Sequence, residues 1–292
     1  MTTHFTARPA TTDGYHLGEG PLWDPGRQRL LWVDITAGAV HEGRLDTATG
    51  EIAHTRARTF DSTVGAVAVA ADGGLLVAER HTLVHVDDRT GTRTPLARLL
   101  PADRHSRLND GAVDPAGRFL VGSLAQDDRT GEELLLRQDG TVLDDDLRLS
   151  NGLAWSPDGS RLYSIDTLPG TVWTRDYDPA TGATGPRRRA FTLHHPDGMC
   201  ADADGNLWIA LWGGGRVERR TPDGDLLAVV TVDAPHTSSV TFAGPGLNTL
   251  VITTARQDLS PADLARHPHS GRLFTARVDA VGLPTTYWNP AL

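Results

Sequence analysis

Four short stretches of the chain carry carboxylate, amide or guanidinium side chains in apolar or turn-like surroundings. They are residues 17–21 (LGEGP), 107–111 (RLNDG), 150–153 (SNGL) and 195–199 (HPDGM). Each lies a few residues before a similar segment, in which a turn leads into an apolar run. Residues that precede a repeated segment by the same number of positions are expected to occupy equivalent places in successive repeats. We therefore expect these side chains to approach one another: Glu19, Asn109, Asp110, Asn151 and Asp197.

The residue types in these stretches could hold a hard metal ion. Converging Glu, Asn and Asp side chains offer two carboxylates and one amide oxygen, which suit Ca²⁺, Mg²⁺ or Mn²⁺ and accept Zn²⁺. Two carboxylates would balance the dication, and three protein ligands would leave positions open for water or substrate. Each Asx-Gly pair alone also fits an ordinary turn. Four such stretches at the same offset favour a shared functional site.

The segments that must position these residues repeat six times. Each has a tight turn with glycine, then a short run rich in Leu, Val, Ile and Trp that is typical of a buried strand. The turn glycines stand about 41 to 47 residues apart: Gly26, Gly73, Gly117, Gly159, Gly205 and Gly246. This period is typical of four-stranded propeller blades. We predict an all-β fold, a six-bladed β-propeller whose four-stranded antiparallel blades surround a central channel, with residues 1–292 as a single domain.

Other architectures and catalytic motifs are poorly supported. The repeat leaves no room for the crossover helices of a parallel sheet. The one clear helix signal is residues 260–266, where Ser260 is a good N-cap and Pro261 fits the first helical position. The sequence lacks the WD40 signature, and it also lacks GxSxG, HExxH and Walker A motifs.

Composition narrows the class of protein further. The formal net charge of −9 argues against a nucleic-acid partner, which needs a basic face. The single cysteine, Cys200, excludes an intrachain disulfide, and its apolar neighbours predict an inert buried thiol. The N-terminal residues lack the apolar core of a signal peptide, and no run is long enough to span a membrane. We expect a soluble cytoplasmic protein without a membrane partner, either a monomer or a weak homo-oligomer.

Five ordered blocks carry a resemblance to a known family. They are GEGPLWD at 18–24, LLWVDI at 30–35, RLNDGAVDPAGRFLVGS at 107–123, SNGLAWSPDGSRLYSIDT at 150–167 and PDGMCADADGNLWIA at 196–210. At these blocks, nearly from end to end, the chain resembles the regucalcin (senescence marker protein)/gluconolactonase family of six-bladed propellers. The resemblance implies a lactonase that opens sugar lactones, such as aldonolactones, to sugar acids with one divalent metal ion. Ca²⁺ is the first choice, with Zn²⁺, Mn²⁺ or Mg²⁺ as alternatives.

The resemblance also implies roles for individual residues. Glu19, Asn151 and Asp197 match the family's metal ligands, and Arg107 and Asn109 match its substrate contacts. A further acidic substrate contact has its nearest counterpart in Asp127, where some relatives have glutamate, so the shorter side chain leaves this contact open. We add the hypothesis that Asp197 is also the general base. Arg107 and Asn109 would hold the hydroxyl groups of the sugar.

Some questions stay open at the level of sequence. Asp202 and Asp204 belong to a repeat turn, and we expect them to serve backbone geometry rather than chemistry. His194, His195 and His236 lie near the predicted site with no assigned role. We expect the loops at residues 124–132 and 212–215 to line the mouth of the site. The alternative functions are a calcium-binding or regulatory propeller without turnover, and a hydrolase of another ester or a phosphotriester.

Overall fold

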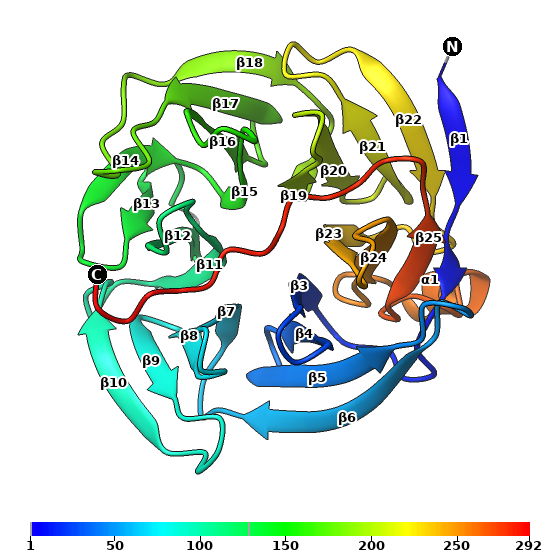
Figure 1. The fold of residues 1–292 in the computed structure, drawn as a ribbon, viewed down its shortest axis with the longest axis horizontal. Helices are drawn as coiled ribbons and strands as arrows, with labels where there is room; N and C mark the ends of the chain where they lie inside the picture. Colours follow the sequence, from blue (N-terminus) through cyan, green and yellow to red (C-terminus); the bar gives the residue numbers. More distant parts are fainter. Residues whose placement is uncertain (1, 128) are drawn as a thin grey trace.

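The fold is a ring of six small sheets around a central channel, as Figure 1 shows for the computed structural model, which describes residues 2–127 and 129–292. This confirms the predicted six-bladed β-propeller. Apart from two N-terminal strands, the strands of each blade pair antiparallel in chain order, and the first of them is innermost. The first three blades contain these strands: β3 (Gly18–Asp24), β4 (Arg29–Asp34), β5 (Ala39–Leu45) and β6 (Ile52–Thr59); β7 (Val64–Val69), β8 (Leu75–Glu79), β9 (Thr82–Val86) and β10 (Arg93–Arg98); β11 (Ser106–Val113), β12 (Phe119–Ala125), β13 (Glu133–Arg137) and β14 (Val142–Leu147).

The last three blades continue the same pattern, and the two ends of the chain meet in them. Their strands are β15 (Ser150–Trp155), β16 (Arg161–Asp166), β17 (Thr171–Asp176) and β18 (Arg188–Thr192); β19 (Pro196–Ala201), β20 (Leu207–Leu211), β21 (Arg216–Arg220) and β22 (Leu226–Thr231); β23 (Thr237–Ala243), β24 (Thr249–Thr254) and β25 (Phe274–Arg277). The N-terminal β2 (Arg8–Pro9) completes the sixth blade by pairing antiparallel with β25. The N-terminal β1 (Thr3–Thr6) adds a fifth strand to the fifth blade, parallel to β22.

All six predicted turns join the first two strands of a blade. In the second to fifth blades the turn glycine adopts a left-handed backbone, with φ of 94° at Gly73 and 99° at Gly117, which a residue without a Cβ adopts at little cost. The first and sixth blades differ, because there the left-handed position is taken by Gln28 (φ 49°) and Leu247 (φ 45°). The repeated glycine therefore marks the turn in every blade without always occupying the same conformation.

The core consists of six apolar clusters, one between each pair of neighbouring blades. Between the fifth and sixth blades, for example, the rings of Trp208 and Phe242 meet edge to face with centroids 5.7 Å apart. Each blade therefore buries its two faces against its two neighbours. Because burial of apolar area is the main favourable term in folding, no blade is stabilised independently of the ring.

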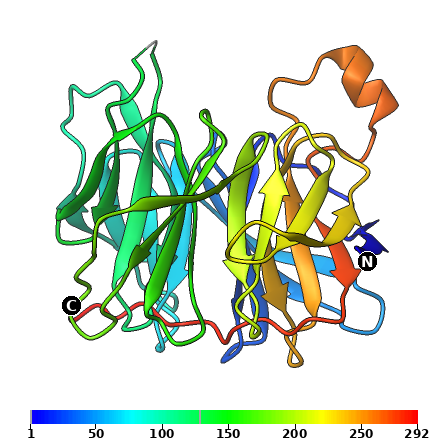
Figure 2. The same cartoon turned by 90° about the horizontal axis from the view of Figure 1, so that it is seen from above.

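The C-terminal segment crosses one mouth of the channel as a strap, which we define as residues 280–289. It is the red chain across the front of the ring in Figure 1, and it lies along one face in the side view of Figure 2. Backbone and side-chain hydrogen bonds tie it to the inner strands or repeat turns of five blades, through the following pairs: Ala203–Val281, Leu247–Gly282, Trp23–Thr285, Val69–Trp288 and Gly117–Asn289. The strap thus links blades that are distant in sequence.

The predicted helix is present at the opposite face of the ring (Figure 2). This helix, α1 (Pro261–Arg266), has Ser260 as N-cap, and the Ser260 side chain accepts a hydrogen bond from the Asp263 backbone. Asp263 in turn accepts from the Ser260 backbone, which forms a capping box. Within the described parts of the chain, no helix is long and apolar enough to cross a membrane.

We expect Trp288→Ala to lower the free energy of unfolding by about 3 to 5 kcal/mol, the usual effect of removing a large buried aromatic side chain. Trp288 is 3% exposed, packs in the cluster between the second and third blades, and donates its indole N–H to Gln138 Oε1 at 3.0 Å. Chemical denaturation would measure the change. Val281→Ala is the matched control, because this side chain of the same strap is 50% exposed. Equal stability of the two variants would contradict a stabilising role for the strap.

Candidate functional site

Five of the predicted site residues line one cavity of about 260 Å³ at the mouth opposite the strap. They are Glu19, Arg107, Asn109, Asn151 and Asp197, and all are buried. They come from the innermost strands of four blades, β3, β11, β15 and β19. The inner strands run in the same direction along the channel, so equivalent offsets along the chain do bring these side chains to the same end.

A β-bulge lies beside the site residues on each of these inner strands. The pairing register shifts between Glu19 and Leu22, between Leu108 and Gly111, between Asn151 and Leu153, and between Pro196 and Met199. A bulge bends its strand and changes the direction in which nearby side chains point. The bulge therefore explains how consecutive residues, such as Asn109 and Asp110, can both face the interior of the ring.

The glycine that follows a site residue allows two inner strands to approach closely. A Cβ on Gly152 would lie 2.6 Å from the Asp197 carbonyl oxygen, and one on Gly198 would collide with the Ser239 side chain. The Asn-Gly and Asp-Gly pairs are therefore needed for contact between blades. They are not the hairpin turns that such pairs form in other contexts.

Hydrogen bonds join three of the site residues directly. Arg107 Nη1 donates to Asn109 Oδ1 at 2.6 Å, and Asn109 Nδ2 donates to Asn151 Oδ1 at 2.9 Å. These bonds are buried, so they hold the amide groups in fixed orientations. Arg107 keeps further donors that can face a ligand in the cavity.

Acidic side chains are concentrated around the site, and burial raises the pKa of each of them. Burial and then repulsion from Asp110 raise the pKa of Glu19 to about 8, and burial raises the pKa of Asp110 to about 6. Burial, followed by repulsion from Glu19 and Asp110, raises the pKa of Asp197 well above its usual range. Burial lowers the pKa of Arg107 to about 10, although Glu19 and Asp197 oppose this change. Two buried carboxyl groups, Glu19 and Asp197, therefore share the positive charge of Arg107, and Asp110 adds a third carboxyl group close to both.

This excess of carboxyl groups fits a divalent cation, since a dication would balance two carboxylates. Among the residues that the structure describes, no group of three or more His, Cys, Asp and Glu side chains is placed to hold a metal ion. An ion in this cavity would therefore need an amide oxygen as well as carboxylates. Asn151 supplies such an oxygen beside Glu19 and Asp197.

Comparison with known proteins assigns the chain to a family. The sequence model of a protein family, described as the SMP-30/Gluconolactonase/LRE-like region, matches residues 17–256. The chain belongs to this family. The chain is also similar to Pentonolactonase XacC of Haloferax volcanii, which is 37% identical over 279 residues, covering 92% of this chain and 93% of that protein. Regucalcin of Xenopus laevis is 35% identical over 277 residues, covering 90% of this chain and 91% of that protein.

A solved structure has the same fold. Regucalcin of Agrobacterium tumefaciens, described as a calcium-binding protein, superposes with a TM-score of 0.89 at 28% identity and 99% coverage of both chains. These matches confirm the resemblance to the regucalcin/gluconolactonase family that the sequence blocks indicate. They name no individual residue of this chain, so the roles of the site residues stay predictions.

Asp127, a predicted substrate contact, does not line the cavity. Asp127 is exposed and accepts hydrogen bonds from Arg129 Nε at 2.9 Å to both carboxylate oxygens. This pairing lowers the pKa of Asp127. Leu124, from the same predicted mouth loop, does line the cavity, as does Trp212 from the other loop. The role of Asp127 stays a prediction.

The histidines near the site lie in three different surroundings. His195 lines the cavity and has a left-handed backbone (φ 44°), which is uncommon for a residue with a side chain. His194 lies against it, with ring centroids 4.1 Å apart. His236 stacks on Trp212 at 4.2 Å, and its Nδ1 lies 2.9 Å from the Gln257 carbonyl oxygen. His195 thus belongs to the cavity wall, and His194 and His236 pack against residues of that wall.

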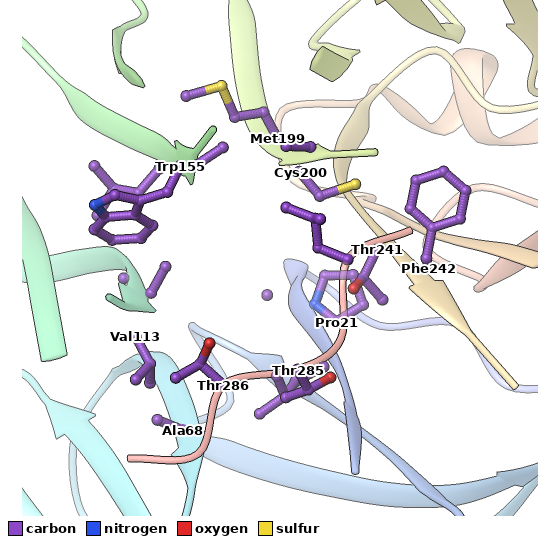
Figure 3. A pocket seen from close by; sticks show the side chains of 18 of the residues that line it. Pro21, Ala68, Val113, Trp155, Met199, Cys200, Thr241, Phe242, Thr285 and Thr286 are labelled. Carbon is purple, nitrogen blue, oxygen red and sulfur yellow. The ribbon is translucent and has the colours of Figure 1, made fainter. Parts of the chain in front are cut away.

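A second cavity, of about 310 Å³, lies at the strap end of the channel (Figure 3). Its walls are the far ends of the inner strands together with strap residues such as Thr285 and Thr286. Asp110 is the only acidic side chain in this lining among the described residues, so the second cavity lacks the paired carboxyl groups of the first. Cys200 lines it and is partly exposed there, and burial raises the pKa of its thiol. The raised pKa fits the predicted inert thiol, whereas the predicted burial is only partial.

We expect the melting temperature in the presence of a chelator to fall as pH rises from about 5 to 8. The folded-state pKa of Glu19, about 8, lies above its ordinary value of 4.5. The native state therefore holds a proton that the unfolded chain has already released, so stability is lost as pH rises between these values. Calorimetry of wild type and Glu19→Gln would test this. The variant should show a flatter decline, and identical slopes would contradict the assignment.

Proposed function

We propose that this protein is a divalent-metal-dependent lactonase that opens a sugar lactone to the corresponding sugar acid. The observation that carries the proposal is the cavity in which buried carboxyl groups adjoin Arg107 and two amides. The names of relatives support the reaction, because one is called a pentonolactonase and the family description includes gluconolactonase. The proposed partner is therefore a small-molecule lactone.

Glu19, Asn151 and Asp197 would hold the metal ion. Their oxygens suit Ca²⁺ best, and Zn²⁺, Mn²⁺ or Mg²⁺ are alternatives. The description of the Agrobacterium tumefaciens relative as calcium-binding supports the first choice. When bound, such an ion polarises a carbonyl oxygen as a Lewis acid and stabilises the negative charge that develops there.

Asp197 would act as the general base. One carboxylate oxygen accepts a proton from water as the water oxygen bonds to the carbonyl carbon of the lactone. The ring C–O bond then breaks, and the proton held by Asp197 passes to the departing ring oxygen. Burial raises the pKa of Asp197, so the ionised form that this role requires would depend on the positive charges of the bound cation and of Arg107 to offset that effect.

Arg107 and Asn109 would bind and orient the sugar. A guanidinium offers several N–H donors to hydroxyl oxygens, and the hydrogen bond from Arg107 to Asn109 fixes both groups. Holding the ring in one orientation beside the base removes much of the entropic barrier to attack. Asp127 is a further candidate contact, which would require it to leave Arg129.

The size of the cavity favours a sugar lactone over a bulkier ester. Its volume of about 260 Å³ is just below the usual range for ligand pockets, roughly 300 to 1,000 Å³. Apolar side chains, including Ile35, Leu149 and Trp212, form much of the remaining wall, which Thr167, His195, Gln257 and Asp258 complete.

The direct test is an assay of pentonolactones and hexonolactones with the purified protein, treated with EDTA and then supplied with single metals. We expect turnover of at least one lactone, loss of activity in EDTA, and recovery on adding Ca²⁺ or Mn²⁺. Tight metal binding without turnover of any lactone would favour the calcium-binding alternative. Turnover of a phosphotriester or simple ester alone would favour the other alternative, a hydrolase of that class of substrate.

We expect Asp197→Asn to lower kcat by at least about 100-fold, since the amide cannot accept the proton. It should also weaken metal binding, measured by isothermal titration calorimetry, because one carboxylate charge is lost. Asp204→Asn is the matched control. Asp204 lies seven residues later in an exposed turn, where its side chain pairs with Arg219. Wild-type activity in Asp197→Asn would overturn the assignment.

A further inference from the structure

Thr167 occupies a position in the site that its sequence surroundings do not suggest. It follows β16 directly, is 6% exposed, and lines the same cavity as Glu19 and Asp197. Its hydroxyl oxygen lies 2.9 Å from Asn151 Nδ2 and 2.7 Å from the Pro196 carbonyl oxygen. One side chain therefore joins the amide of Asn151 to the backbone that immediately precedes Asp197.

The chemistry of these partners fixes the direction of each bond. A carbonyl oxygen can only accept a hydrogen bond, so the single hydroxyl proton of Thr167 is donated to Pro196. The hydroxyl then has only lone pairs left for Asn151, which must donate through its NH₂ group. The Asn151 amide therefore turns its nitrogen towards Thr167 and its oxygen Oδ1 away from it.

The other end of the network requires the same orientation. Arg107 can only donate, so it meets Asn109 at the amide oxygen. Asn109 Nδ2 then donates to Asn151 Oδ1 and to the Ser150 carbonyl oxygen, each at 2.9 Å. A one-way chain of donors thus runs from Arg107 to Pro196, and both ends agree on which atom of Asn151 is oxygen.

We propose that Thr167 is a positioning residue that sets the metal affinity of the site through Asn151 and Asp197. This inference rests on the proposed function, in which Asn151 Oδ1 is a metal ligand. A cation needs the amide oxygen, because the NH₂ group has no lone pair to offer. Without the Thr167 hydroxyl, only the bond from Asn109 Nδ2 holds the Asn151 amide in this orientation, and the carbonyl before Asp197 loses its donor. Partners of this kind typically change metal affinity by about 10- to 100-fold.

The alternative is that Thr167 only satisfies a buried carbonyl and stabilises the blade. That role would lower the melting temperature of a variant and leave metal affinity unchanged. Metal affinity is therefore the measurement that distinguishes a positioning role of Thr167 from a purely structural one.

The experiment compares Thr167→Val, Thr167→Ser and Thr174→Val in the full chain, stripped with chelator and titrated with Ca²⁺ and Mn²⁺ by calorimetry. Valine keeps the volume and loses the hydroxyl, whereas serine keeps the hydroxyl. Thr174 is the matched control: it lies in the same blade, is 8% exposed, and its hydroxyl has no hydrogen-bond partner among the described residues. We expect Kd to rise about 10- to 100-fold in Thr167→Val. It should stay close to wild type in the other two variants.

The outcomes distinguish this inference from the proposed function. If wild type binds metal and Thr167→Val binds it equally well, the inference is wrong and the lactonase proposal stands. If wild type binds neither ion, the metal assignment fails and the inference fails with it. Circular dichroism melts in chelator check folding. If Thr167→Val does not fold, Thr167→Ala, which only removes atoms, takes its place with the same expected rise in Kd.

Discussion

The ring must close, because each blade covers its apolar faces only with its neighbours. The six apolar clusters lie between blades, so an open ring would leave two large faces in water. Both ends of the chain serve this closure. The N-terminal β2 completes the sixth blade beside β25, and the C-terminal strap ties inner strands or repeat turns of five blades together. Everything at the channel depends on this closure.

Closure also creates the functional site. The inner strands converge at the channel, and glycines such as Gly152 and Gly198 let neighbouring strands approach more closely than a Cβ would permit. Carboxyl groups from separate blades are thereby buried close together, at a cost in solvation that raises their pKa values. An isolated blade could not hold these charges in this arrangement, since each contributes only one or two of them.

The two mouths of one channel have different chemistry, although the same strands build both. At the strap end the lining is mostly small and apolar, with Thr285 and Thr286 across the opening. At the other end, the first residues of the same strands carry the carboxyl, amide and guanidinium groups. Asp110 faces the strap-end cavity and still contributes to the charge at the site. The polarity of the parallel inner strands is the reason for this difference.

The sequence by itself determined the number of blades, the turns, the short helix and the common position of Glu19, Asn151 and Asp197. These follow from local turn chemistry and a fixed period, which act within a few residues. Only the tertiary structure decided the rest. The strap, the pairing of Asp127 with Arg129, and the contact of Thr167 with Asn151 and Pro196 depend on contacts that no local pattern encodes. The orientation of the Asn151 amide is likewise set by a hydrogen-bond network that joins residues of three blades.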